Sequence, residues 1–141
     1  MIGPDSSQDL ILVFDVGTQG LRGSLIDKDG TFRAFVRETY DRPYYSLGPN
    51  LAEQSPDFYF AHLCAVGKKL RDEAPDAFAR VRGVTVTVFR DTTVCLDADG
   101  KPLRDCILWM DQRRAEHPKQ LSAARRALFS LVGMSETIRM L

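Results

Sequence analysis

The sequence predicts an α/β fold, in which a mixed sheet begins with a three-strand antiparallel meander and helices pack on the sheet. Three apolar segments in succession support this prediction, at residues 10–14, 21–26 and 31–40. The connections between them are too short for a crossover, so neighbouring strands must run antiparallel. A helical segment then precedes a β-branched strand at residues 81–88, which can therefore lie parallel to the first strand.

The first strand and the turn after it carry the main candidate site. Leu10–Phe14 is a continuous apolar run, which indicates a strand buried on both faces. Asp15 closes this run, and because an unpaired buried carboxylate is costly, we expect a partner for its charge. The turn consists of Gly17, Thr18, Gln19 and Gly20. Backbone N–H groups beside an acid suit a phosphate with its magnesium, although an ordinary hairpin could carry the same residues.

The next segment predicts a helix that packs one face on the sheet. Ser55 is the expected N-cap, Pro56 suits the first helical position, and the helix should run to about Asp72. Apolar side chains recur there at helical spacing and predict a buried stripe. The stripe consists of Phe60, Leu63, Cys64, Val66, Gly67 and Leu70.

Shorter elements are expected in the rest of the chain. Residues 93–96 and 107–109 each predict a short strand. Helical patterns follow at residues 111–116 and 119–132, and Gly133 is expected to end the second of these.

Composition narrows the classes of protein to which the chain can belong. Its 141 residues fit one domain, and 19 basic residues balance 19 acidic ones, which argues against a nucleic-acid-binding protein. No apolar run approaches the ~20 residues that cross a bilayer, and the polar residues 1–9 predict a flexible leader rather than a signal peptide. We therefore expect a cytoplasmic protein. The three scattered cysteines are expected to be reduced core residues: Cys64, Cys95 and Cys106.

Three motifs occur in order along most of the chain. They are Asp15–Gln19 with Arg22 and Asp27, then Ala52–Pro56, then Asp97–Leu103 followed by Ile107–Arg113. Together they resemble the N-terminal part of the FGGY carbohydrate kinases, which include xylulokinases, ribulokinases and glycerol kinases. The resemblance spans roughly residues 10–115. It implies an actin-like ATPase fold of the ribonuclease H type, with residues 10–141 forming an N-terminal kinase domain that is truncated at its C-terminal end.

The resemblance also implies roles for individual residues. Asp15 would help to hold Mg²⁺, and the ATP phosphates would lie against Gly17, Thr18, Gln19 and Arg22. Four residues would lie on the sugar side: Arg90, Asp91, Trp109 and Asp111. The catalytic base of the family lies downstream of residue 141, so no catalytic residue is assigned here and the chain alone is expected to be inactive.

The implied reaction transfers the γ-phosphoryl group of ATP to a hydroxyl of a small sugar or polyol. Glycerol kinases carry Arg-Glu where this chain has Arg90 and Asp91, whereas the segment Trp109–Arg113 is closer to the pentulose kinases. A ketopentose such as xylulose is the first expectation and a glycerol-like polyol the second, and a structural ion pair between Arg90 and Asp91 is the alternative at that place. The expected partners are a C-terminal kinase domain and a second copy of the chain. An actin-like assembly or regulatory module without sugar chemistry is the alternative function.

Overall fold

The computed structural model describes residues 9–113 and 122–133 of the chain. The chain divides into two compact units, residues 1–111 and residues 112–141. In the first unit the elements are β1 Leu10–Val16, β2 Gly20–Asp27, β3 Phe32–Thr39, β4 Glu53–Gln54, α1 Pro56–Glu73, α2 Pro75–Phe78, β5 Val81–Val88 and β6 Cys106–Ile107. The second unit contains α3, Ala123–Leu131.

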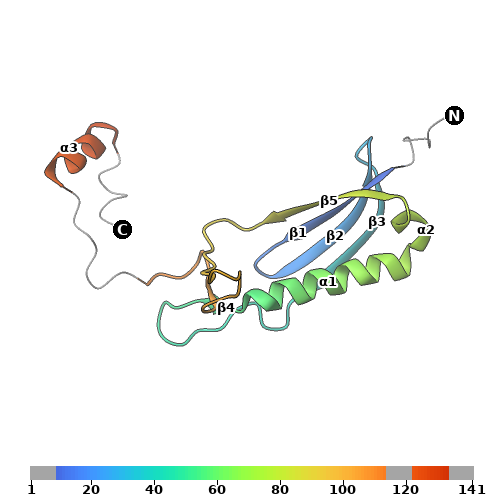
Figure 1. Cartoon of the computed structure of the whole chain (residues 1–141), viewed down its shortest axis with the longest axis horizontal. Helices are drawn as coiled ribbons and strands as arrows, with labels where there is room; N and C mark the ends of the chain where they lie inside the picture. The colour runs from blue at the N-terminus through green and yellow to red at the C-terminus, as the bar shows by residue number, and fades with distance from the viewer. Residues whose placement is uncertain (1–8, 114–121, 134–141) are drawn as a thin grey trace. The chain divides into compact units, whose positions relative to one another are not determined.

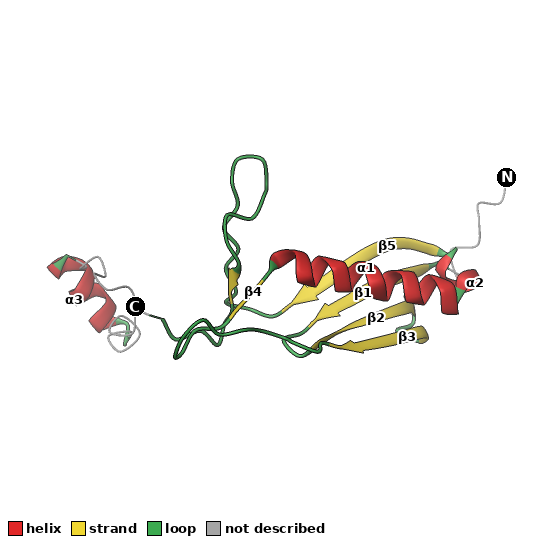
Figure 2. Ribbon diagram, turned by 90° about the horizontal axis from the view of Figure 1, so that it is seen from below, coloured by secondary structure: helices red, strands yellow, loops and turns green. Residues whose placement is uncertain are grey.

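The main sheet has four strands in the order β3-β2-β1-β5. β1 pairs antiparallel with β2, β2 pairs antiparallel with β3, and β5 lies parallel to β1. Figure 1 shows the three strands of the meander side by side, and Figure 2 shows α1 lying along one face of the sheet. The predicted meander, the predicted parallel strand at residues 81–88 and the helix between them are confirmed.

Burial along β1 shows that the sheet has one covered face. Leu10, Leu12, Phe14 and Val16 are buried and belong to the core cluster that also contains Val66 and Leu70 of α1. Ile11 lies on the opposite face and is 43% exposed. The prediction that this strand is buried on both faces is therefore wrong. Only one face of the strand is buried because α1 and α2, the helices described in residues 9–111, both pack against the same core cluster.

α1 approaches the sheet closely where β2 has a glycine. A Cβ added to Gly23 would lie 2.5 Å from Val66 Cγ1 and 2.8 Å from Leu70 Cδ1, so a larger residue would push α1 away from β2. Val66 and Leu70 of the predicted stripe are buried, but Phe60 is 67% exposed and Cys64 is exposed as well, so the stripe is narrower than predicted.

The ends of α1 agree with the prediction in position but not in every contact. Ser55 is the N-cap and Pro56 the first helical residue, as predicted. The Ser55 side chain makes no capping hydrogen bond, whereas its backbone carbonyl accepts from the Phe58 N–H at 3.2 Å. α1 ends at Glu73, one residue beyond the predicted end.

A second, two-stranded sheet joins β4 to β6 in antiparallel register. Its core cluster contains Ala52, Cys106 and Leu108. The predicted strand at 107–109 therefore lies one residue earlier and is shorter, and the one predicted at 93–96 is reduced to single bridges from Thr93 and Leu96.

The helix α3 is described by itself. Ser122 caps it by accepting a hydrogen bond from the Arg125 N–H at 3.5 Å, and Gly133 follows it with φ of 74°, as predicted for the residue that ends the helix. Residues 111–113 are not helical, so the helix predicted at 111–116 does not begin there. Residues 1–8, 114–121 and 134–141, which include the predicted truncated end and the predicted leader except Asp9, lie outside the described residues.

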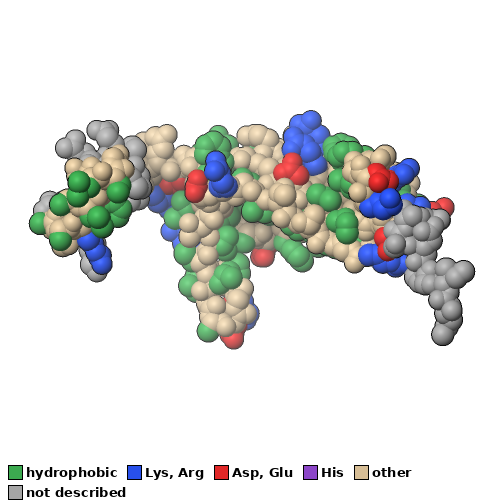
Figure 3. All heavy atoms as spheres, turned by 90° about the horizontal axis from the view of Figure 1, so that it is seen from above, with side chains coloured by type: hydrophobic (Ala, Val, Ile, Leu, Met, Phe, Trp, Pro, Cys, Tyr) green, Lys and Arg blue, Asp and Glu red, His purple; other side chains and the backbone are tan. Residues whose placement is uncertain are grey.

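The structure can be compared with three expectations from composition: balanced surface charge, the lack of a membrane span, and buried cysteines. On the face shown in Figure 3, Asp and Glu side chains lie beside Lys and Arg side chains, in keeping with the balanced charge. Within the part of the chain that the structure describes, no helix is long and apolar enough to span a bilayer.

All three cysteines are free thiols. Cys106 is buried as predicted, whereas Cys64 and Cys95 are exposed, so these two are not core residues.

Replacing Gly23 with alanine should destabilise the chain, because the new methyl group would overlap two side chains of α1. We expect the free energy of unfolding to fall by about 1–3 kcal/mol, the usual cost of overpacking. Urea denaturation measures this change. Gly48→Ala is the matched control, since its Cβ would meet only Leu51 Cδ1 at an ordinary 3.5 Å. Equal denaturation midpoints for the two variants would contradict the described contact between β2 and α1.

Candidate functional site

The turn between β1 and β2 is held closed by its own backbone and by β3. The Gly17 N–H donates to the Gly20 carbonyl at 2.9 Å. A Cβ at Gly20 would overlap the carbonyl oxygen of Glu38 in β3, so glycine is required by close approach at this residue. The Tyr40 N–H donates to the Gln19 carbonyl at 3.1 Å, which attaches the turn to the end of the meander.

Asp15 has the partner that the sequence predicts, in the form of an ion pair across two strands. Its Oδ2 accepts from Nη1 of Arg22 at 2.6 Å, and its Oδ1 accepts from the Thr87 hydroxyl at 3.1 Å. Both side chains of the ion pair are 47% exposed, so Asp15 lies on the open face and not at a buried strand end. Thr87 was not anticipated from the sequence, because its place beside Asp15 depends on the parallel pairing of β1 with β5.

Asp27 belongs to the same motif, but its contacts are structural and lie within the turn between β2 and β3. Its Oδ1 accepts from the backbone N–H groups of Thr31 at 2.9 Å and Asp29 at 3.0 Å, and Oδ2 pairs with Arg33. The Thr31 hydrogen bond is the largest cause that holds the pKa of the Asp27 carboxyl below its usual value. Asp27 therefore organises the turn between β2 and β3.

A cavity of about 370 Å³ opens beside the β1–β2 turn, and we call it the turn cavity. Its lining contains the four predicted phosphate-side residues, Gly20 of the same turn, Trp109 from the predicted sugar side, and two residues that had no predicted role, Arg37 and Met110. The full lining is Gly17, Thr18, Gln19, Gly20, Arg22, Arg37, Trp109 and Met110. Arg37 lies directly opposite Arg22 in the β2–β3 register. Among the described residues Arg37 has no ion-pair partner, so the turn cavity carries an uncompensated positive charge.

A second cavity, of about 340 Å³, lies beside the segment after β5, and we call it the loop cavity. Thr18, Phe89, Arg90, Asp91 and Trp109 line it. Asp91 has φ of 56°, a left-handed conformation that is uncommon for a residue other than glycine and occurs often at functional sites. Arg90 and Asp91 form no ion pair in the described residues, so the structural ion pair considered for them is not present.

Trp109 and Thr18 line both cavities. The indole N–H of Trp109 donates to the Thr18 hydroxyl at 3.0 Å, across 91 positions of sequence. Asp111, predicted for the sugar side, instead accepts from the Ala52 N–H at 2.7 Å through Oδ2 and lines neither cavity. The structure thus brings Arg90, Asp91 and Trp109 together in one cavity, and Asp111 is not among its lining residues.

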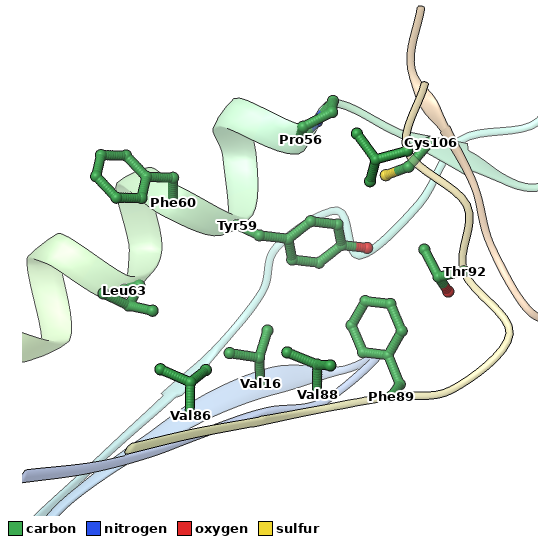
Figure 4. Close-up of a pocket in the computed structure, with 11 residues that line it drawn as sticks. Val16, Pro56, Tyr59, Phe60, Leu63, Val86, Val88, Phe89, Thr92 and Cys106 are labelled. Atoms are coloured by element: carbon green, nitrogen blue, oxygen red, sulfur yellow. The ribbon is translucent and has the colours of Figure 1, made fainter. Parts of the chain in front are cut away.

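A third cavity, of about 340 Å³, lies between α1 and the β1–β5 edge and is apolar (Figure 4). In Figure 4 Tyr59 and Leu63 of α1 face Val16, Val86 and Val88 of the sheet. Burial raises the pKa values of the Tyr59 hydroxyl and the Cys106 thiol, both of which line this cavity. None of the described residues that line it carries a charge, so this lining does not suit a phosphate.

Comparison with known proteins decides the family. The sequence model of the FGGY family of carbohydrate kinases, N-terminal domain, matches residues 10–135. The chain belongs to this family. It is similar to glycerol kinase from Koribacter versatilis, with 29% identity over 81% of this chain and 23% of that protein.

Solved structures of FGGY kinases share the fold of this domain. The chain resembles a xyloylose kinase from Brucella ovis with a TM-score of 0.67 and 28% identity, over 74% of this chain and 22% of the other. Plasmodium falciparum glycerol kinase with ADP gives a TM-score of 0.63 at 19% identity, over 89% of this chain and 23% of that one. The predicted actin-like ATPase fold is therefore confirmed, and the chain spans about a fifth to a quarter of the length of these FGGY kinases.

The left-handed backbone of Asp91 should cost stability that glycine would recover. We expect Asp91→Gly to unfold with a free energy about 1 kcal/mol higher than Asp91→Ala, because glycine has no Cβ to clash at positive φ. Urea denaturation measures both variants.

Arg90, the residue before Asp91, gives a matched control, because there the glycine variant should be less stable than the alanine variant. Arg90 does not have a positive φ, so Arg90→Gly should be less stable than Arg90→Ala by about 0.5–1 kcal/mol. If glycine is the less stable choice at both positions, the described conformation of Asp91 is incorrect.

Proposed function

We propose that this domain supplies the phosphate-side and sugar-side walls of an ATP-dependent carbohydrate kinase. The parent protein would transfer the γ-phosphoryl group of ATP to a hydroxyl of a small polyol or sugar. The observation that carries this proposal is the pair of adjoining cavities: one is lined by two arginines and a glycine turn, the other by an arginine, a carboxylate and an indole ring. Phosphoryl transfer needs these two kinds of site next to each other, because its catalysis consists mainly of positioning and charge neutralisation.

The turn cavity fits the phosphates of ATP by its donor set. Arg22 and Arg37 present guanidinium groups from neighbouring strands, and Thr18 adds a hydroxyl. Arg22 is already paired with Asp15, whereas Arg37 has no ion-pair partner among the described residues. An anion bound in the cavity would supply that partner and reduce the repulsion between the two opposed guanidinium groups. Gly17, Thr18, Gln19 and Arg22 are therefore assigned to ATP, and Arg37 is added to them.

Asp15 fits a hydrated magnesium ion, which would neutralise phosphate charge when bound. A carboxylate has about four lone-pair sites, of which the hydrogen bonds to Arg22 and Thr87 use two. Mg²⁺ usually keeps several waters and binds through one or two carboxylates and phosphates, so a single carboxylate beside a phosphate site is enough to hold it.

The loop cavity fits a substrate with adjacent hydroxyl groups. A guanidinium donates hydrogen bonds in a fork and a carboxylate accepts them, so Arg90 and Asp91 together can hold a vicinal diol. Trp109 offers an apolar ring for the C–H face of the substrate. Arg90 and Asp91 both line this cavity, and a matched relative is a glycerol kinase. We therefore propose a glycerol-like polyol as the first candidate substrate and a ketopentose as the second.

The remaining parts of the reaction lie beyond these cavities. The proposed catalytic base and the adenine site belong to a C-terminal kinase domain, in agreement with the fraction of the relatives that the chain spans. Residues 10–141 are thus proposed to bind ligands without turnover. Asp111 is proposed to position the substrate wall through Ala52 rather than to touch the sugar.

Ligand binding to the chain tests this function. Saturation-transfer NMR should show contact with glycerol and with xylulose, and no contact with 1-propanol, which lacks adjacent hydroxyls. A coupled assay should detect no release of ADP. If Mg-ATP binds while none of the polyols and sugars does, and the chain pellets on adding nucleotide, the actin-like assembly module replaces the kinase proposal.

Arg37→Gln should weaken the binding of inorganic triphosphate by about 2- to 5-fold, since an exposed ion pair contributes roughly 0.5–1 kcal/mol. Isothermal titration at low salt measures the affinity. Arg71→Gln is the matched control: it removes the same charge from the exposed end of α1, where Asp72 at 3.4 Å is the ion-pair partner of Arg71 within the described part of the chain. An equal loss of affinity in both variants would show that Arg37 acts through net charge and not in the turn cavity.

A further inference from the structure

The hydrogen bond between Trp109 and Thr18 joins the two cavities. Thr18 comes from the β1–β2 turn and Trp109 from the segment after β6. They are the two residues that line both the turn cavity and the loop cavity. Any ligand that fills one cavity therefore contacts a group that is bonded to the wall of the other.

The chemistry of the two groups fixes the direction of this bond. An indole N–H can only donate, so the Thr18 hydroxyl must accept from it. The hydroxyl proton is then left for another acceptor, and it has none among the residues that the structure describes. Arg22 and Arg37 make the turn cavity attractive to an anion, whose oxygen atoms can accept that proton.

The exposure of Trp109 makes the bond sensitive to a neighbouring ligand. Trp109 is 54% exposed, so in the free chain water competes for the indole N–H. A polyol that packs on the ring would exclude this water and strengthen the bond to Thr18. The hydroxyl proton would then be held toward the turn cavity for a larger fraction of the time.

We propose that Trp109 is a positioning residue that couples the polyol site to the phosphate site through the Thr18 hydroxyl. This inference rests on the proposed function of the two cavities. Polyol bound in the loop cavity raises the affinity of the turn cavity for a phosphate oxygen, and phosphate raises the affinity for polyol by the same factor, as linkage requires. The coupling favours a state in which both ligands are present over a state in which ATP is bound alone.

The test uses the whole chain and the fact that Trp109 is its only tryptophan. Inorganic triphosphate with Mg²⁺ is titrated with and without saturating glycerol, and the fluorescence and the indole N–H signal of Trp109 report binding. In the wild type, glycerol should lower the Kd of triphosphate by about 5-fold, within the usual range of coupling between two sites. The reverse titration, with glycerol as the varied ligand, should give the same factor.

Two variants separate the bond from the wall of the cavity. Trp109→Phe keeps an aromatic ring but removes the N–H, and Thr18→Val keeps the shape of the side chain but removes the hydroxyl. Each should still bind both ligands, followed by calorimetry, but with a coupling factor of about 1. Arg37→Gln is the comparison variant: it should weaken triphosphate binding and leave the coupling factor at the wild-type value.

Each outcome decides between the proposals. Independent binding of the two ligands to the wild type overturns the coupling and leaves the proposed function standing, as does coupling that survives in Trp109→Phe. Failure of the wild type to bind triphosphate or to bind any polyol overturns both proposals. Loss of the coupling in both bond-deleting variants, with retention in Arg37→Gln, supports the role of Trp109.

Discussion

The pairing register of β1 between its two neighbours is the constraint on which the candidate site depends. Asp15 lies opposite Arg22 in the antiparallel pairing and opposite Thr87 in the parallel pairing. A slip of one residue would exchange the two faces of β1 and expose Phe14, which is only 3% exposed. The apolar core under α1 therefore fixes the position of a carboxylate that the core itself does not contact.

The ion pair between Asp15 and Arg22 orients the site more than it stabilises the fold. Both partners are about half exposed, and pairs of this kind contribute little to the free energy of unfolding. Exchange of partners is therefore inexpensive for both groups, since a cation near Asp15 and an anion near Arg22 can each replace part of the existing attraction. A fully buried pair would lack this property, because removing either partner would leave an uncompensated charge.

Local sequence pattern predicted the strands, α1 and the turn because each depends on periodicity and on turn residues. The same pattern could not show how many faces of the sheet are covered, since a continuous apolar run such as Leu10–Phe14 fits one covered face or two. Arg37 was missed for another reason. Its position opposite Arg22 is set by the β2–β3 register, which shifts between Leu25 and Ile26, and no sequence pattern indicated that shift. Thr87 was missed because its partner lies across a parallel pairing.

The residues that place Trp109 connect the small sheet to the chemistry of both cavities. Ala52 accepts from the Leu108 N–H at 3.0 Å and donates its own N–H to Asp111 at 2.7 Å, so one residue holds the chain on either side of Trp109. Leu108 is buried in one cluster with Ala52, whereas the next residue, Trp109, is 54% exposed. Trp109 reaches Thr18, 91 positions earlier in the sequence, from the segment that Ala52 holds. Asp111 lines neither cavity, but its hydrogen bond to Ala52 ties it to that segment.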